Sequence, residues 1–215
     1  MKWGIFMTKI TWITHACFKI KTNSGKVIYT DPYKMETDEV ADIILVSHDH
    51  PDHAEKNSIK KVYNSNTKVI CPKNCTSGLK KFDPIGLSLN NVKEFDDITI
   101  ITVRSYTPNK KFHPKNNNWL GYIIEVDGKR IYHAGDTDLI PEMEKLGDID
   151  VALIPVGGTY TCNMEEGAEA CAIIKPKICV PMHDWDKDLS VFVKLAKEKA
   201  PDVQIEILKD KDLEI

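Results

Sequence analysis

Ser47-His48-Asp49-His50-Pro51-Asp52-His53 is the stretch that decides the fold of this chain. It follows Ile43-Ile44-Leu45-Val46, a short, β-branched and uncharged run that predicts a buried strand. Pro51 cannot donate to a strand ladder, so the strand ends and the chain turns. Imidazoles and carboxylates therefore follow the carboxyl end of a buried strand, where α/β proteins place their functional loops.

The spacing of these side chains favours metal binding. Three of the seven histidines fall within residues 48–53. Neutral imidazole suits Zn, Fe, Mn or Ni, and a carboxylate adds charge. A tight turn lets His48 and His50 face one metal while Asp52 and His53 point toward a second. The alternative is a polar surface loop rich in histidine, which this concentration of ligands argues against.

The pattern H-x-H-x-D-H resembles the signature of the metallo-β-lactamase superfamily, and further motifs follow in that family's order. They are Thr14-His15-Ala16-Cys17-Phe18, Asp31-Pro32, Gly135-Asp136-Thr137, Pro155-Val156-Gly157-Gly158 and Pro181-Met182-His183. The set is most similar to the branch of small hydrolases that includes L-ascorbate-6-phosphate lactonase. The resemblance implies an α/β fold, a four-layer α/β/β/α sandwich, over residues 1–215 as a single domain.

Composition narrows the class of protein. Apolar residues make up 42% and charged residues 28%, with a net charge of −3 and no basic stripe, so no nucleic-acid polymer is expected as a partner. No apolar run approaches the roughly 20 residues of a membrane span, so no membrane partner is expected either. The first eight residues are too short and interrupted for a signal peptide. We expect a cytoplasmic enzyme with a small-molecule substrate. Such an enzyme can form a homo-oligomer.

The six cysteines lie at scattered, mostly apolar positions, which predicts reduced core thiols. Cys71 and Cys75 form a C-x3-C pair, and a structural zinc there is a minor alternative.

Strands are predicted early in the chain and alternate with helices later, which favours two sheets covered by outer helices. The predicted strands are residues 9–13, 17–21, 26–30, 43–46, 68–71, 98–104, 119–126, 129–133, 151–155, 177–180 and 203–208. The predicted helices are residues 55–63, 76–81, 141–146, 163–174 and 188–199. Asp127-Gly128 predicts a tight hairpin turn, and Asn163 with Glu166 predicts a capping box.

Two further residues stand at predicted strand ends. Asp136 follows Ile131-Tyr132-His133-Ala134-Gly135, and His183 follows Ile178-Cys179-Val180-Pro181-Met182. The resemblance implies that Asp136 bridges two metals and that His183 is a ligand of the second metal. The alternatives are a helix cap for Asp136 and a hydrogen-bonded core imidazole for His183.

The third ligand of the first metal is less clear from sequence. Much of the superfamily has a histidine after the strand that corresponds to residues 100–104, but this chain has Ser105-Tyr106-Thr107 there. His113 lies six residues beyond Thr107 on a long polar loop, from which it can reach back as a substitute ligand. A substrate contact and a solvated loop histidine are the alternatives.

Several residues are candidates for contact with the substrate or with the ligands. The resemblance places His15 near the site, while a core imidazole is the alternative. Gly157-Gly158 lets the backbone at Thr159 and Tyr160 approach a ligand, or forms a simple turn. Lys111, with Lys110 and Lys115, favours an anionic substrate or merely aids solubility. His133 is expected to be a buried strand residue.

These features together predict a metal-dependent hydrolase with two divalent metal ions. Zinc is the expected metal, and Mn, Fe and Ni are the alternatives. A metal-bridging hydroxide would attack an ester, lactone or phosphodiester of a small substrate, and Asp52 would be the catalytic carboxylate as well as a ligand. One alternative is a catalytically degenerate metal-binding protein, supported by the missing histidine after residues 100–104. The other is a di-iron redox protein, but such members replace the second histidine of the motif by Glu, and His50 argues against it.

Overall fold

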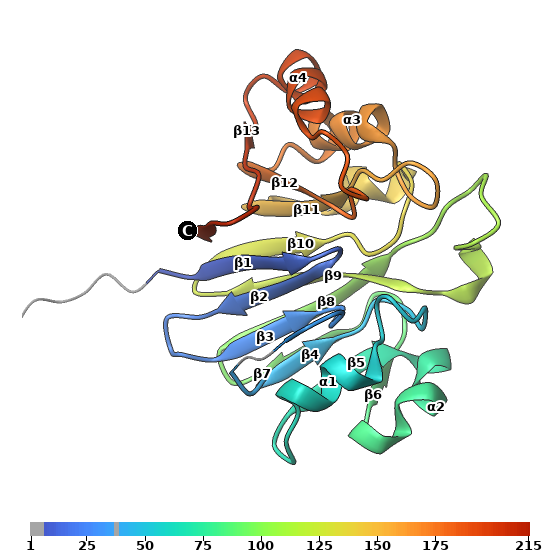
Figure 1. The fold of residues 1–215 in the computed structure, drawn as a ribbon, viewed down its shortest axis with the longest axis vertical. Helices are drawn as coiled ribbons and strands as arrows, with labels where there is room; N and C mark the ends of the chain where they lie inside the picture. The colour runs from blue at the N-terminus through green and yellow to red at the C-terminus, as the bar shows by residue number, and fades with distance from the viewer. Residues whose placement is uncertain (1–6, 37–38) are drawn as a thin grey trace, which may run out of the picture.

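Two seven-stranded sheets lie face to face in the computed structural model, which describes residues 7–36 and 39–215 (Figure 1). Residues 1–6, on which most of the signal-peptide argument depends, lie outside the described residues. The sheets are joined by short loops, and the carboxyl ends of several strands meet along one edge.

The first sheet has the strand order β14-β1-β2-β3-β4-β5-β6. Its strands are β1 (Lys9–Thr14), β2 (Cys17–Lys21), β3 (Val27–Thr30), β4 (Ile43–Leu45), β5 (Lys68–Pro72), β6 (Ile85–Leu87) and β14 (Asp212–Glu214). The β1, β2 and β3 strands form the predicted antiparallel meander, and β3, β4, β5 and β6 pair in parallel. The buried β4 strand therefore delivers residue 47 to the carboxyl end of a parallel array.

The second sheet has the strand order β13-β12-β11-β10-β9-β8-β7. Its strands are β7 (Val92–Phe95), β8 (Ile98–Arg104), β9 (Leu120–Val126), β10 (Lys129–His133), β11 (Val151–Pro155), β12 (Ile178–Met182) and β13 (Gln204–Ile205). The predicted hairpin turn is present, since Asp127 and Gly128 have φ angles of +53° and +72°. The β10, β11 and β12 strands run in parallel and end at the same edge as β4.

Strand alternation separates two packed layers. Ile28 and Leu45 point into the core between the sheets, where they join Ile100 and Ile124 of the second sheet. Tyr29, next to Ile28, points to the opposite face, where it packs with Ile59 of α1. A side-chain period of two thus lets each strand of the first sheet contribute to both layers.

Helices cover the outer face of each sheet (Figure 1). α1 (Lys56–Val62) and α2 (Thr76–Leu79) lie beside the first sheet, and α3 (Met164–Ile174) and α4 (Ser190–Lys199) lie beside the second. The capping box at the start of α3 is present, with Asn163 accepting from Glu166 N and Glu166 accepting from Asn163 N. The predicted four-layer α/β/β/α arrangement is confirmed.

Some element predictions need correction. Strands β6, β7 and β14 were not predicted, and the strand expected over residues 203–208 is limited to β13. The helix expected at residues 141–146 is a 3-10 helix, Pro141–Lys145, and further 3-10 turns occupy Lys73–Cys75, Lys80–Phe82 and Lys115–Asn117. After the short strand β13, the chain leaves this sheet and returns to the first sheet, where β14 pairs with β1.

All six cysteines are buried. Burial raises the pKa of Cys71 to about 12, so this thiol carries its proton at neutral pH. The groups of metal-capable side chains among residues 7–36 and 39–215 contain no cysteine, so a structural zinc on Cys71 and Cys75 has no support. In the same part of the chain, no helix has the length and apolar character needed to cross a membrane.

Candidate metal centre

Asp31 holds the histidine-rich loop from the neighbouring strand. Its carboxylate accepts hydrogen bonds from the Ser47 backbone N–H at 2.7 Å and from the Ser47 hydroxyl at 2.6 Å. Its Oδ2 atom also lies 2.8 Å from Nδ1 of His53. Asp31 has a φ of +40°, a left-handed conformation that Asp adopts more readily than most residues. One buried carboxylate therefore fixes both ends of the loop that follows β4.

Side chains from distant parts of the chain converge beyond the carboxyl ends of the strands. Ligand atoms that all lie within 4.8 Å of one another form three groups: His48, His50 and His113; His15, Asp52, His53 and His183; and His48, His53 and Asp136. The first two groups share no residue, and the third group draws one residue from each. The arrangement offers two neighbouring cation positions with Asp136 between them. All seven predicted ligands are brought together here.

Asp136 lies at the centre of this cluster. Its Oδ2 atom is 3.2 Å from Nε2 of His113 and 3.1 Å from Nε2 of His183. Its Oδ1 atom is 3.3 Å from Nε2 of His53. Burial alone would raise the pKa of Asp136, but the charges of His53 and His183 hold it well below its ordinary value. The carboxylate is therefore ionised and acts as an acceptor or a ligand.

The donor set fits a metal ion better than it fits a hydrogen-bond network. Despite these short distances, Nε2 of His53, Nε2 of His113 and Oδ1 of Asp136 are buried without an aligned hydrogen-bond partner among the described residues. Both ring nitrogens of His183 are likewise buried without an aligned hydrogen-bond partner among the described residues. Roughly 90% or more of buried polar groups in proteins are satisfied, so a cluster of unsatisfied atoms needs an explanation. Imidazole nitrogen and carboxylate oxygen are ligands that divalent transition metals prefer.

Contacts outside the cluster orient two of these histidines. Nδ1 of His113 lies 3.1 Å from the Tyr160 carbonyl oxygen, to which it donates, and Nδ1 of His53 faces Asp31. Such contacts leave Nε2 free for a metal. Burial lowers the pKa of His53, yet the carboxylates of Asp136 and Asp31 hold it well above the ordinary value. A cation at this position would compete with that proton.

His48 and His50 form the other side of the cluster. Nε2 of His48 lies 3.0 Å from Nδ1 of His50, and Nδ1 of His48 lies 2.9 Å from the Ser47 hydroxyl. Burial lowers the pKa of both imidazoles, for His48 well below the usual value. The centroid of the Trp119 ring lies 4.8 Å from that of the His48 ring and 4.9 Å from that of the His50 ring. Both histidines are therefore neutral and held rigidly, as a metal ligand must be.

His15 lies beside the predicted ligands Asp52 and His183. Its Nε2 atom is 3.3 Å from Oδ2 of Asp52, and its ring centroid is 3.8 Å from that of His183. Its backbone carbonyl accepts the His183 N–H at 3.0 Å. Burial lowers the pKa of His15, while the contact with His15 helps to hold the pKa of Asp52 at about 2 against the effect of burial. His133, in contrast, is a core residue whose Nε2 lies 2.8 Å from the Ala16 carbonyl.

A small cavity of about 180 Å³ opens over the cluster. It is lined by His50, Asp52, Phe112, His113, Asp136, Tyr160, His183 and Trp185. Tyr160 is thus at the site, whereas Thr159 and Lys111 are exposed and do not belong to this lining. A substrate contact for Thr159 and Lys111 stays a prediction.

Two of the three lysines of the loop before β9 are engaged by acidic partners. Lys110 forms an ion pair with Asp138 and donates to the Thr161 carbonyl at 2.7 Å. Lys115 lies 3.1 Å from the Glu142 carboxylate. These contacts anchor the loop that carries His113, and they account for both lysines without an anionic substrate.

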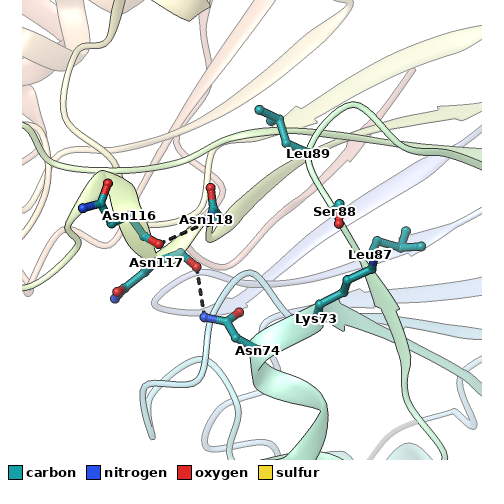
Figure 2. Close-up of a pocket in the computed structure, with 8 residues that line it drawn as sticks. All are labelled: Lys73, Asn74, Leu87, Ser88, Leu89, Asn116, Asn117 and Asn118. Carbon is teal, nitrogen blue, oxygen red and sulfur yellow. Dashed lines mark hydrogen bonds between the residues drawn. The ribbon is translucent and has the colours of Figure 1, made fainter.

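A larger hollow of about 480 Å³ lies elsewhere, near the 3-10 turn at Lys115–Asn117. Figure 2 shows its lining, which contains no member of the metal-capable groups. Two of its amides are used within the wall, since Asn74 donates to the Asn117 carbonyl at 2.9 Å and Asn118 donates to the Asn116 carbonyl at 3.1 Å. Its size alone does not indicate a catalytic function, and the metal-capable cluster is the better candidate site.

Sequence reasoning missed three kinds of residue at this site. Asp31 was noted as part of a motif, but its contacts with Ser47 and His53 were not predicted. The aromatic side chains of Phe112 and Trp185 at the mouth, and of Trp119 behind His48, were not predicted either. A carboxylate directly after a strand could have signalled Asp31, but isolated aromatic residues in loops carry no such signal.

Comparisons with known proteins agree with this geometry. Residues 9–183 match the model of the beta-lactamase superfamily domain. A UPF0173 metal-dependent hydrolase of Archaeoglobus fulgidus is 31% identical over 94% of this chain and 96% of its own length. A second, from Nanoarchaeum equitans, is 34% identical over 96% of this chain and 100% of its own.

A solved structure shares both sequence and fold. A crystal structure of a candidate metal-dependent hydrolase from Parabacteroides distasonis is 32% identical, covers 93% of this chain and 92% of its own, and superposes with a TM-score of 0.85. The similarity to the lactonase branch stays a prediction, because these relatives are described only as metal-dependent hydrolases. On the sequence match and the shared fold, the chain belongs to the beta-lactamase superfamily, among the UPF0173 metal-dependent hydrolases.

Proposed function

We propose that this protein is a hydrolase that uses two divalent cations, zinc first, to cleave an ester, lactone or phosphodiester of a small substrate. The observation that carries the proposal is the convergence of unsatisfied, buried imidazole nitrogens on the ionised carboxylate of Asp136. His48, His50 and His113 would hold one cation. Asp52, His53 and His183 would hold the other, with Asp136 shared between them.

The chemistry supplied by the bound cations is activation of water near neutral pH and stabilisation of negative charge on the attacked centre. The residues of the chain prepare this chemistry. His48 and His50 are kept neutral by burial, so their nitrogens are ready to ligate. Asp31 and the Tyr160 carbonyl hold the rings of His53 and His113 in orientation.

Asp52 is the proposed catalytic carboxylate. It lines the cavity, and its pKa of about 2 leaves it ionised at neutral pH, as a ligand of a cation must be. In this proposal it would also orient the attacking water and pass a proton to the leaving group. His15 contacts Oδ2 of Asp52 at 3.3 Å and would hold that carboxylate in position.

The position of His113 weakens the degenerate alternative. That alternative depends on a missing third histidine, and His113 supplies a nitrogen next to His48 and His50 from the loop beyond β8. The backbone of this loop is held by the hydrogen bond from Thr107 N to His113 O at 2.8 Å.

The test combines metal content with turnover. Bound metal per chain is measured by elemental analysis, and hydrolysis of an ester, a lactone and a phosphodiester is measured before and after chelation and metal return. We expect two metals and activity that follows metal content, with most turnover lost in Asp52→Asn. Near-normal kcat in Asp52→Asn would rule out its role, and bound metal without hydrolysis of any substrate would support the degenerate alternative.

A further inference from the structure

We infer that the substrate is a neutral acyl compound with one planar apolar group, such as a phenylacetyl ester, whose ring packs against Phe112, Tyr160 and Trp185. This inference rests on the proposed function of the metal-capable cluster. It departs from the anionic substrate that the loop lysines suggest in the sequence.

Exposed aromatic surface is concentrated at the mouth of the cavity. Six large apolar side chains in the described residues are markedly exposed, and Phe112 and Trp185 are the two aromatic ones, each 49% exposed. Both line the same small cavity, together with Tyr160. Leaving two large rings half in water has a free-energy cost, and such patches commonly mark binding sites.

The three rings form a continuous wall although they come from three different loops. The ring centroids of Phe112 and Tyr160 are 4.6 Å apart and those of Tyr160 and Trp185 are 6.0 Å apart. The Trp185 ring is also 5.3 Å from the His183 ring. A planar group that rests on this wall therefore begins next to a proposed metal ligand, where the bond to be cleaved would lie.

The position of Trp185 is built into the backbone. His183, Trp185 and Asp186 have φ angles of +53°, +53° and +56°, a left-handed conformation that costs free energy in non-glycine residues. Gly157 accommodates this segment, because a Cβ atom there would lie 2.6 Å from Cδ1 of Trp185. A strained segment that presents an indole ring to solvent at a candidate site is consistent with a role in binding.

The charges near the mouth favour a neutral ligand. Lys110 is paired with Asp138, and Lys187 donates to the Gly157 carbonyl at 2.5 Å. Among the described residues, the lining of the cavity holds no lysine or arginine and contains the carboxylates of Asp52 and Asp136, so it offers no ammonium or guanidinium group to a phosphate at the distal end of a substrate. The cavity volume of about 180 Å³ is below the roughly 300 Å³ of a typical ligand pocket, which limits the apolar group to about one ring.

In the reaction, a water oxygen bonds to the ester carbonyl carbon, the bond from that carbon to the alkoxy oxygen breaks, and the alcohol leaves with a proton. The test compares methyl phenylacetate with methyl acetate and with monomethyl succinate, each followed by acid release. We expect kcat/KM for methyl phenylacetate to exceed that for each of the others by about tenfold or more. Trp185→Ala and Phe112→Ala are each expected to remove most of this preference.

Binding gives a second readout that does not need turnover. Phenylacetamide binding is measured by calorimetry on the metal-loaded and the metal-free chain, with acetamide as the reference ligand. We expect saturable binding of phenylacetamide that Trp185→Ala weakens by about tenfold. Val191→Ala, which alters a side chain that is 50% exposed outside this cavity, is the matched control and should leave binding unchanged.

The outcomes separate this inference from the proposed function. Hydrolysis of methyl acetate or monomethyl succinate as fast as methyl phenylacetate, with no effect of Trp185→Ala, would overturn the inference and leave the hydrolase intact. Absence of hydrolysis with every ester, lactone and phosphodiester, but Trp185-dependent binding of phenylacetamide, would overturn the proposed function and support the aromatic site.

Discussion

Nδ1 of His53 lies 2.8 Å from Oδ2 of Asp31, so a carboxylate at the end of β3 sets the orientation of an imidazole that faces the Asp136 carboxylate. The same Asp31 carboxylate accepts two hydrogen bonds from Ser47. The position of the histidine-rich loop and the orientation of His53 thus depend on one buried side chain outside the proposed ligand set.

Asp31→Asn is expected to lower metal affinity. Asn keeps the size of the side chain and tolerates the left-handed backbone at this position, but it lacks the charge that holds His53. Loss of such an outer contact costs about 10–100-fold in metal affinity. The measurement is a zinc competition titration against a chelating indicator.

Asp42→Asn is the control for this substitution. Asp42 also accepts a backbone hydrogen bond, from Val27 N at 2.8 Å, but it does not belong to the groups of metal-capable side chains. Equal zinc affinity in Asp31→Asn, Asp42→Asn and the unmodified chain would show that Asp31 has only a structural role.

His113→Ala is expected to reduce bound metal from two ions per chain to about one. His113 supplies one of three histidine nitrogens on the His48 side, and without it only His48, His50 and the shared Asp136 would remain to hold that cation against dialysis. Elemental analysis after dialysis gives the number directly. His133→Gln serves as the control, because His133 is a buried histidine outside the cluster. Two metals retained in His113→Ala would instead assign His113 to the substrate side.

Much of the fold could be predicted from sequence because the buried strands are short apolar runs with a polar residue at the carboxyl end. The runs that became β4, β11 and β12 are almost fully buried, and His48 and His183 follow two of them as predicted. The burial of these strands is a property of local composition. The convergence of their ends follows from parallel pairing in each sheet.

The remaining elements depend on tertiary contacts. The edge strand β7 contains Val92, which is 59% exposed, and two charged residues, so its sequence lacks the alternation of a half-buried strand. The position of His113 depends on a loop that folds back through Lys110 and Thr107, so its place in the sequence leaves its role as a ligand open. The aromatic wall assembles from three loops, and no local pattern predicts such an assembly.

Gly157→Ala is expected to destabilise the protein and to perturb the mouth of the cavity. The added Cβ would lie 2.4 Å from the His183 carbonyl oxygen and 2.6 Å from Cδ1 of Trp185, so the backbone at His183 must shift. Such overpacking costs about 1–3 kcal/mol of unfolding free energy. Urea denaturation measures this loss, and zinc titration measures any effect on His183, a proposed ligand.

Gly78→Ala is the matched control for the glycine change. Gly78 lies in α2, and a Cβ there would meet nothing within 4 Å, so the substitution should be neutral or stabilising by up to about 1 kcal/mol. Equal stability of both variants would contradict the close packing of Gly157 against His183 and Trp185.

The stability of the protein is expected to fall as pH rises above about 10. The Tyr122 hydroxyl donates to the Val46 carbonyl at 2.7 Å, immediately before the histidine-rich loop, and burial raises its pKa well above the usual value of 10.0. Burial also raises the pKa of Tyr132. An unfolded chain loses both protons near pH 10 while the folded chain keeps them, so the stabilising contribution is complete below pH 10 and is lost above it.

Urea denaturation at pH 7, 9 and 10.5 checks this expectation. Above pH 10, each buried tyrosine lowers the unfolding free energy by about 1.4 kcal/mol per pH unit. Tyr122→Phe should cost about 1–3 kcal/mol at pH 7, because the buried Val46 carbonyl loses its donor, and it should also reduce the alkaline slope. If ultraviolet titration shows every tyrosine ionising reversibly near pH 10 with the fold intact, Tyr122 is not held in the core as described.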